Sequence, residues 1–506
     1  MDEVTEVRTT GTATDVSSRR PEGPAPDSST STVRSGSART RLAHMLVAVR
    51  TPPWILALVT FAVLAAIYCL YSIQRHERFG STGWDLGIFT QAVKAYGHFR
   101  APVVPLEGTD VNLLGDHFQP WIAVIGPLYR LFPTPVTLLV VQGLLFALAA
   151  IPIVRLAARR LGMAVGVFIA IAYGLAWGIA QALAFDFHEI ALAVPLLAFS
   201  LVAVVEERWR AALLYALPLV FCKEDLGVTV VVIAAVVALR FGRVSYRWAV
   251  GTAIWGAAWT LIAAKVIIPA MGSGDYTYES KFADSPAEGV RGFIIGVSQG
   301  DARASTAFLL LVITLFLAVR SPIILVAVPT LTWRFLSVNH LYWGFGFHYN
   351  ATLMPVMIVA MLDALIRLRG RSMSQRTVVG FAAAAAAIAV VLAWAGPLDR
   401  LTERDFYSRG DQAQAVDEFG AMIPDGQSVA TTNNLAPHLV ADHEVTLFPK
   451  QKRDRSTAQW IMVDTNISGL FPANKADTNK ALEKIEDSGQ YVRVAADDGV
   501  VLLRLR

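Results

Sequence analysis

Cysteine and charge are the two features that this sequence has little of. Its 506 residues include only 2 cysteines, Cys69 and Cys222, and both stand inside apolar runs. This pattern excludes a disulfide framework and a structural zinc site. Charged residues make up 17% of the chain and hydrophobic residues 54%, whereas a soluble protein carries about 25% charged residues. The composition therefore predicts a membrane protein, and the small net charge of +4 gives no reason to expect a nucleic-acid partner.

Long apolar runs fill residues 46–397, which we expect to form a transmembrane domain. Crossing a hydrocarbon core of about 30 Å takes roughly 20 apolar residues in a helix. The runs predict an α-helical polytopic membrane protein with about eleven transmembrane helices. The predicted spans are 53–74, 136–157, 161–184, 188–205, 209–222, 226–240, 247–270, 304–320, 322–338, 350–368 and 377–396.

Basic residues indicate which side of the membrane each loop faces. Residues 1–45 are rich in Ser, Thr, Pro, Gly and Arg, which predicts a disordered cytoplasmic tail. Arg-rich connections such as 155–160 and 367–376 lie on the same side as this tail in the predicted order of spans, as the positive-inside rule requires. The long loops 75–135 and 271–303 then face outward. We expect a multi-pass protein of the cell membrane with a cytoplasmic N-terminus.

The stretch 209–240 has two interpretations. One long helix would place the basic loop that follows it outside, against the charge rule. Two helices of about 14 and 15 residues respect the rule but are short for a full crossing. We prefer two helices, so that the acidic and basic apex Lys223-Glu224-Asp225 lies below the outer surface as the floor of a pocket.

Residues 398–506 have the composition of a soluble domain. Short β-like runs occur at 427–433, 444–449, 460–466 and 491–506, and a helical pattern covers 476–488. The pair Asp498-Gly499 inside the last run is a hairpin signal. We expect a small extracytoplasmic α/β domain, because the last predicted span exits on the outer side.

Asp85 is the principal candidate for catalysis. It lies in the motif Trp84-Asp85-Leu86-Gly87 at the start of the first outer loop, where apolar positions predict an interfacial helix. A carboxylate there can cap the exposed N–H groups of a helix. A partly desolvated carboxylate can also act as a general base toward a hydroxyl. Both roles remain open from sequence.

Further polar residues gather in the predicted outer loops. Asp116 is the reserve candidate for the base, and with His117 it could equally cap a turn. Buried ionisable groups in a membrane are costly and usually face an interior cavity. The residues that we expect to line such a pocket are His117, His188, Glu189, Lys223, Glu224, Asp225, His340, His348 and Tyr349.

Two cations break the positive-inside pattern. Lys265 and Arg334 lie near the outer ends of their predicted spans. Snorkelling to lipid headgroups explains many such residues, and binding of a lipid phosphate is the alternative. His, Asp and Glu from several loops are also ligand types for a divalent metal, but their spacing is not diagnostic of one, and no cofactor is indicated with certainty.

Several motifs resemble one bacterial family. The stretches GWDLGIFTQAV, GDHFQPWIAVIGPLYRLFPTP, FDFHEIALAVPLL, FCKEDLG and FHYNATLMP look like those of the polytopic family called domain of unknown function 2079, over roughly residues 80–370. The segment IPDGQSVATTNNLAPHL resembles the tails of such proteins. This resemblance names a family without implying an activity.

A more distant resemblance is to membrane glycosyltransferases of the GT-C class. Those enzymes combine many spans with a large first outer loop, an acidic residue soon after the first helix, and sugar donors linked to polyprenyl phosphate. Asp85 matches that position in outline, although it stands alone where those enzymes carry an adjacent acidic pair. The resemblance implies a cell-envelope glycosyltransferase that binds a polyprenyl-phosphate or glycolipid ligand in the lipid bilayer. A glycolipid transporter or lipid-handling protein, and a non-catalytic scaffold, are the alternatives.

Overall fold

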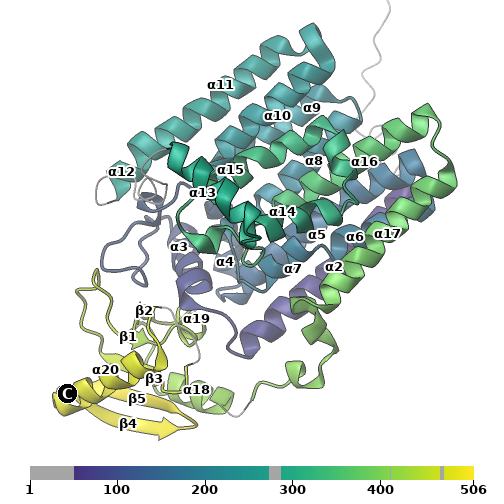
Figure 1. The fold of residues 1–506 in the computed structure, drawn as a ribbon. Helices are drawn as coiled ribbons and strands as arrows, with labels where there is room; N and C mark the ends of the chain where they lie inside the picture. The colour runs from purple at the N-terminus through teal and green to yellow at the C-terminus, as the bar shows by residue number, and fades with distance from the viewer. Residues whose placement is uncertain (1–50, 273–285, 411, 468–471) are drawn as a thin grey trace, which may run out of the picture. The chain divides into compact units, whose positions relative to one another are not determined.

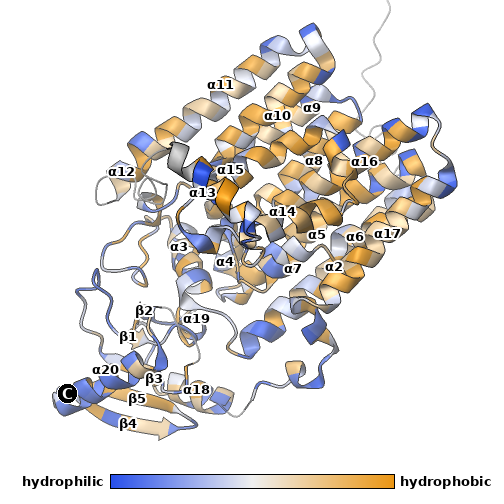
Figure 2. Cartoon of the chain, viewed as in Figure 1, coloured by the Kyte–Doolittle hydropathy of each residue, from blue (hydrophilic) through white to orange (hydrophobic). Residues whose placement is uncertain are grey.

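The computed structural model describes residues 51–272, 286–410, 412–467 and 472–506. Apolar helices dominate the chain up to Trp394 (Figures 1 and 2). The helices of this part are α2 (Pro52–Glu77), α5 (Val136–Leu161), α6 (Met163–Gly174), α7 (Trp177–Leu183), α8 (Ala193–Val205), α9 (Trp209–Ala216), α10 (Leu226–Phe241), α11 (Tyr246–Ile262), α14 (Ala302–Val312), α15 (Val328–Leu336), α16 (Leu353–Arg371) and α17 (Gln375–Trp394).

Helices occupy every predicted span, but the count of eleven transmembrane helices is not established. Six segments of the described chain are long and apolar enough to cross a membrane. They are Pro52–Glu77, Val136–Leu161, Met163–Leu183, Leu226–Val244, Tyr246–Met271 and Gln375–Trp394. Four shorter apolar helices, Glu189–Val205, Trp209–Phe221, Ala302–Val312 and Pro322–Leu336, have 10–17 residues, less than the roughly 20 that a perpendicular crossing needs.

The prediction of two helices between residues 209 and 240 agrees with the structure. The first consists of α9 and a 3₁₀ turn, η5 (Leu217–Phe221), and the second, α10, begins at Leu226. The predicted span 161–184 is also divided, because α6 ends at Gly174 and α7 begins at Trp177. Such breaks expose backbone polar groups, and they are tolerated at membrane depth only where protein or a cavity surrounds them.

Helix α16 is buried over its first thirteen residues. All of its residues from Leu353 to Leu365 are buried, including Asp363. The Asp363 carboxylate accepts hydrogen bonds from Ser321 Oγ at 2.6 Å and from Arg240 Nη1 at 2.8 Å. It also pairs with Arg367 at 2.9 Å. The one carboxylate of this helix is therefore neutralised by Arg240 of α10 and by Arg367 of its own helix, as a charge in an apolar interior requires.

Shorter helices lie in the long loops. After α2 the chain makes a π-helical turn, η1 (Gly83–Gly87), which continues into α3 (Ile88–Gly97), and α4 (Gly126–Leu131) precedes α5. Helix α12 (Ile268–Met271) ends the apolar segment that begins with α11, and α13 (Pro286–Ser298) lies in the second long loop. Leu86, Phe89 and Val93 are buried rather than lipid-facing, so the predicted interfacial helix packs into the protein.

The C-terminal part is a small α/β fold. Its sheet has the order β2-β1-β3-β5-β4, built from β1 (Ser428–Thr431), β2 (Glu444–Leu447), β3 (Trp460–Asp464), β4 (Tyr491–Asp497) and β5 (Val500–Leu505). Strand β1 is parallel to β2 and β3, and β5 is antiparallel to β3 and β4. The helices are α18 (Gln412–Ala421), α19 (Ala436–Leu439) and α20 (Lys475–Asp487). Asp498 and Gly499 both have positive φ between β4 and β5, as the predicted hairpin requires.

Candidate functional site

A short polar anchor fixes the turn that carries Asp85. Asp186 is buried and pairs with Arg75 near the end of α2. Its other oxygen accepts a hydrogen bond from the backbone N–H of Thr82 at 2.9 Å. Thr82, rather than Asp85, is the residue that precedes the first helical position of η1. The capping role considered for Asp85 therefore does not describe its place in the turn.

The Asp85 carboxylate points to the α7–α8 connection. Its Oδ1 lies 3.1 Å from His188 Nε2, and its Oδ2 lies 3.4 Å from Thr82 Oγ1. The side chain of Asp85 is 20% exposed and that of His188 is 5% exposed. A partly buried carboxylate beside an imidazole is an arrangement that can accept a proton from a hydroxyl.

His188 connects this carboxylate to a second histidine. The rings of His188 and His348 stack with centroids 3.6 Å apart, and Phe185 stacks on His188 at 5.2 Å. Burial, and then the neighbouring His188 and Lys223, lower the pKa of His348 well below its ordinary value. His348 is therefore neutral at physiological pH. Among the described residues, the Nδ1 atoms of both histidines are buried without a hydrogen-bond partner.

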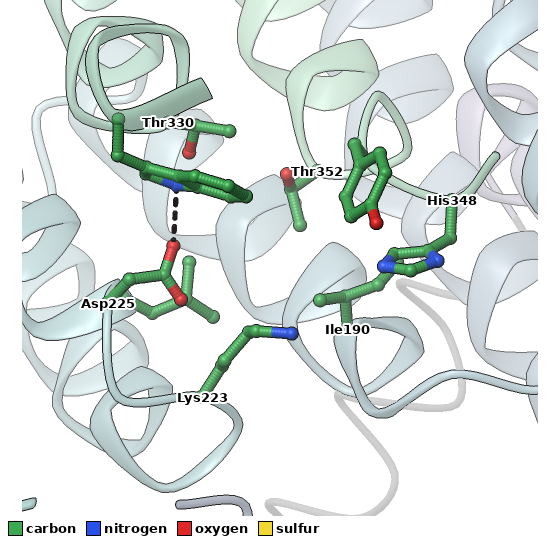
Figure 3. Close-up of a pocket in the computed structure, with 9 residues that line it drawn as sticks. Ile190, Lys223, Asp225, Thr330, His348 and Thr352 are labelled. Carbon is green, nitrogen blue, oxygen red and sulfur yellow. Dashed lines mark hydrogen bonds between the residues drawn. The ribbon is translucent and has the colours of Figure 1, made fainter. Parts of the chain in front are cut away.

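His348 also lines a small cavity whose walls are mostly apolar but which charged side chains face (Figure 3). Asp225 and Lys223 approach this cavity from the apex of the hairpin 209–240, and His348 and Tyr349 come from the loop before α16. The cavity volume is about 20 Å³, enough for about one water molecule. The full lining consists of Ile190, Lys223, Asp225, Leu226, Thr330, Trp333, His348, Tyr349 and Thr352.

Two charges of opposite sign face this cavity. Lys223 Nζ lies 2.6 Å from Glu189 Oε1. Burial lowers the pKa of Lys223, but Glu189, Glu224 and Asp225 raise it by more, so that the ammonium stays charged. Burial raises the pKa of Asp225 to about 6, against the opposing effect of Lys223. Trp333 Nε1 donates to Asp225 Oδ2 at 3.0 Å, whereas Asp225 Oδ1 has no hydrogen-bond partner in the described parts of the chain.

Glu224, in the same Lys223–Asp225 apex, contacts the long loop between α2 and α5. Its Oε1 lies 2.7 Å from His117 Nδ1, and its Oε2 accepts from the Phe118 N–H at 3.1 Å. Burial would raise the pKa of Glu224, but His117 and Lys223 lower it to about 2. Burial and Lys223 lower the pKa of His117, yet Glu224 and Asp116 raise it further, and the net shift is upward. Asp116 lies beside this pair, with its Oδ2 3.7 Å from His117 Nε2.

Of the predicted site residues, Lys223, Asp225, His348 and Tyr349 line the cavity, whereas Lys265, Arg334 and His340 belong neither to the cavity nor to the contacts of Asp85 and Glu224 described above. Arg334 is fully buried behind Tyr349 and donates to Tyr342 O, Asn350 Oδ1 and Gly344 O, each at 2.8 Å. These bonds anchor the loop between α15 and α16. Lys265 and His340 have exposed side chains, in a π-helical turn after α11 and in the α15–α16 loop.

Trp333, Thr330 and Thr352 line the cavity but were not among the predicted site residues. Trp333 directly precedes Arg334. An aromatic residue next to a basic residue near the end of a predicted span is the pattern that could have identified Trp333 as a site residue. Within the described residues, no group of three or more His, Cys, Asp or Glu side chains could hold a metal ion. The metal hypothesis therefore has no support from this geometry.

The long apolar helices define a polytopic membrane protein. Residues 75–502 match the family of predicted membrane proteins DUF2079, and the chain belongs to this family. Its fold is similar to that of ArnT from Cupriavidus metallidurans in a crystal structure bound to undecaprenyl phosphate. The TM-score is 0.52 at 12% sequence identity, over 88% of this chain and 97% of ArnT. No curated protein matches the chain.

Proposed function

We propose that this protein is a glycosyltransferase that uses a polyprenyl-phosphate-linked sugar at the outer face of the cell membrane. The observation that carries the proposal is the 3.1 Å contact between Asp85 and His188. His188 in turn stacks on His348, which lines the cavity, so this contact connects the carboxylate to the cavity. The similarity of the fold to that of a protein bound to undecaprenyl phosphate supports the choice of donor class.

Asp85 is the proposed general base. It accepts the proton of an acceptor hydroxyl while the hydroxyl oxygen forms a bond to the anomeric carbon of the donor sugar. The bond between that carbon and the phosphate oxygen breaks, and its electron pair leaves with the polyprenyl phosphate. His188 orients the Asp85 carboxylate. An oriented base of this kind contributes roughly 10²–10⁴-fold to a rate.

Lys223 is the proposed partner of the departing phosphate inside the cavity. Its ammonium faces the cavity with Asp225, His348 and Tyr349 around it (Figure 3). A fixed cation in a site of low dielectric stabilises developing negative charge more strongly than it would in water. Lys265, which is exposed near the outer end of its helix, is the proposed contact for the lipid phosphate as it enters. A sugar phosphate is larger than the cavity, so donor entry requires the loop carrying His348 to shift.

Transfer of a labelled sugar tests the proposal. Purified protein in lipid nanodiscs is incubated with radiolabelled undecaprenyl-phosphate sugars and a membrane extract as the source of acceptors. We expect covalent transfer by the wild-type protein and loss of at least about 10²-fold in Asp85→Asn, with unchanged membrane insertion. Asp110→Asn is the matched control, because Asp110 is an exposed residue of the same loop with a positive φ that Asn tolerates.

Two results would contradict this proposal. Saturable binding of undecaprenyl phosphate without transfer from any donor would favour lipid handling over catalysis. Full transfer by Asp85→Asn together with loss of transfer in Asp116→Asn would move the base to the other outer-loop carboxylate.

A further inference from the structure

The two backbone N–H groups immediately before Asp85 are both bound by one residue of the C-terminal part. Gly83 N–H donates to Asn433 O at 2.6 Å, and Trp84 N–H donates to Asn433 Oδ1 at 2.8 Å. The first N–H groups of a helix have no partner within the helix itself. Asn433, 349 positions away from Trp84 in the chain, provides the hydrogen-bond acceptors for two of these N–H groups.

Asn433 is held rigidly where it makes these bonds. It follows strand β1, at the carboxyl edge of the parallel strands, and it is 8% exposed. On one side of it, Thr432 Oγ1 accepts from the Asp464 N–H at 3.2 Å. On the other side, Asn434 Nδ2 donates to Asp464 Oδ2 at 2.7 Å. The residues flanking Asn433 are thus both tied to the end of β3, which fixes its backbone.

The turn η1 and helix α19 of the C-terminal part lie so close together that no side chain fits between them at Gly83. A Cβ atom on Gly83 would lie 2.5 Å from Ala436 Cβ in α19, inside van der Waals contact. Farther along α3, Gln91 Nε2 donates to Val445 O at 2.8 Å and Lys94 Nζ donates to Ala441 O at 2.7 Å. The contact is therefore continuous from η1 along α3.

We propose that Asn433 is a positioning residue for Asp85, so that the C-terminal domain forms part of the transfer site. This inference rests on the proposed function of Asp85. Asp85 directly follows Trp84, and therefore the bond from Trp84 N–H to Asn433 Oδ1 sets the rotation of the turn that aims the carboxylate at His188. A misplacement of about 1 Å in a catalytic group can cost about 10²-fold in rate.

Hydrogen exchange measures this role without a substrate. In Asn433→Ala, we expect the amide of Trp84 to exchange about tenfold faster, as the loss of one hydrogen bond predicts, whereas Gly83 keeps the backbone carbonyl of residue 433 as its acceptor. Asn433→Asp retains an acceptor oxygen and should restore slow exchange. The matched control is Asn474→Ala, which removes a hydrogen bond to Asp477 within α20 and should leave the exchange of Gly83 and Trp84 unchanged. Equal exchange in wild type and Asn433→Ala would overturn the proposal.

A compensating pair of substitutions provides a second test. Gly83→Ala introduces the clash with Ala436, and Ala436→Gly removes the opposing methyl group. We expect fast exchange at Trp84 in Gly83→Ala and slow exchange in the double variant. If Gly83→Ala alone leaves exchange slow, the contact does not hold the turn and the proposal fails.

Kinetics then link the contact to chemistry. Asn433→Ala should lower kcat about 10²-fold with KM for the undecaprenyl-phosphate sugar changed less than about twofold, because the base is displaced and the donor pocket is not. Asn433→Asp should recover most of the loss. An unchanged kcat in Asn433→Ala overturns the positioning role even if exchange rises. If the wild-type protein shows no transfer at all, the proposed function fails, whereas the exchange experiments still decide whether Asn433 holds the turn.

Discussion

Asp85 and His188 meet through a hydrogen bond of 3.1 Å although 103 positions separate them in the chain. Asp85 comes from the π-helical turn after α2, and His188 comes from the connection between α7 and α8. Asp186, two residues before His188, anchors the same turn through Thr82. The α7–α8 connection therefore both orients the Asp85 carboxylate and holds the backbone that carries it.

Substitution of His188 should affect turnover more than donor binding. In His188→Ala, Asp85 loses its oriented partner and His348 loses the ring stacked on it at 3.6 Å. We expect kcat to fall roughly 10–100-fold with little change in KM, and His188→Gln, whose amide can still donate to Asp85, to recover part of the loss. Steady-state transfer kinetics provide the measurement. A rise in KM at constant kcat would place His188 in donor binding instead.

The charge on Asp225 should make phosphate binding depend on pH. Burial raises the pKa of Asp225 to about 6, so this carboxylate is negative above that pH and repels an anionic headgroup near Lys223. Affinity for undecaprenyl phosphate should increase as the pH falls through 6, and Asp225→Asn should weaken this dependence. A phosphate monoester also titrates near pH 6, and the difference between wild type and variant is therefore the quantity to measure. Identical pH profiles would contradict the prediction.

The pair of His117 and Glu224 should stabilise the protein over a defined pH range. The pKa of His117 is raised above its ordinary 6.5, so its contribution is complete below pH 6.5 and is lost as the pH rises through the raised value. The pKa of Glu224 is lowered from 4.5 to about 2, so its contribution is complete above pH 4.5 and is lost as the pH falls toward 2.

Thermal unfolding checks this range. The Tm of the wild-type protein should fall by on the order of 2 °C above pH 6.5, and His117→Gln should lack that fall. His340→Gln is the control, because His340 is exposed in another loop. The same alkaline fall in His117→Gln and wild type would assign it to other groups.

Arg334 should contribute to stability rather than to phosphate binding. Arg334→Met removes the 2.8 Å donors of the Tyr342 and Gly344 carbonyls, and Gly344 keeps only the 3.4 Å bond from Asn350 Nδ2. The free energy of unfolding should fall by on the order of 3 kcal/mol. Arg334→Lys keeps the charge but has one nitrogen for three acceptors, so it should be destabilised as well. Chemical denaturation and hydrogen exchange of the α15–α16 loop are the measurements. Normal stability with weakened undecaprenyl-phosphate binding would restore the phosphate role.

Local patterns predicted the elements of this fold well. Apolar runs marked the positions of the helices, and Asp498-Gly499 marked the hairpin between β4 and β5. The number of helices that cross the membrane completely was harder to predict from the sequence. For example, α6 and α7 are separated by a break that contains no proline. Burial of such a break depends on neighbouring helices, and composition does not specify them.

The sequence by itself determined that the chain enters a membrane, where its helices and strands lie, and which loops hold the ionisable residues, since these follow from side chains close together in the chain. Only the tertiary structure decided which residues meet. It pairs Asp85 with His188, gives Arg334 three oxygen acceptors from its own loop, and brings Asn433 to the turn before Asp85. The contacts of His188 with Asp85 and of Asn433 with the turn join segments 103 and 349 positions apart, and the packing that fixes them cannot be read from any one segment.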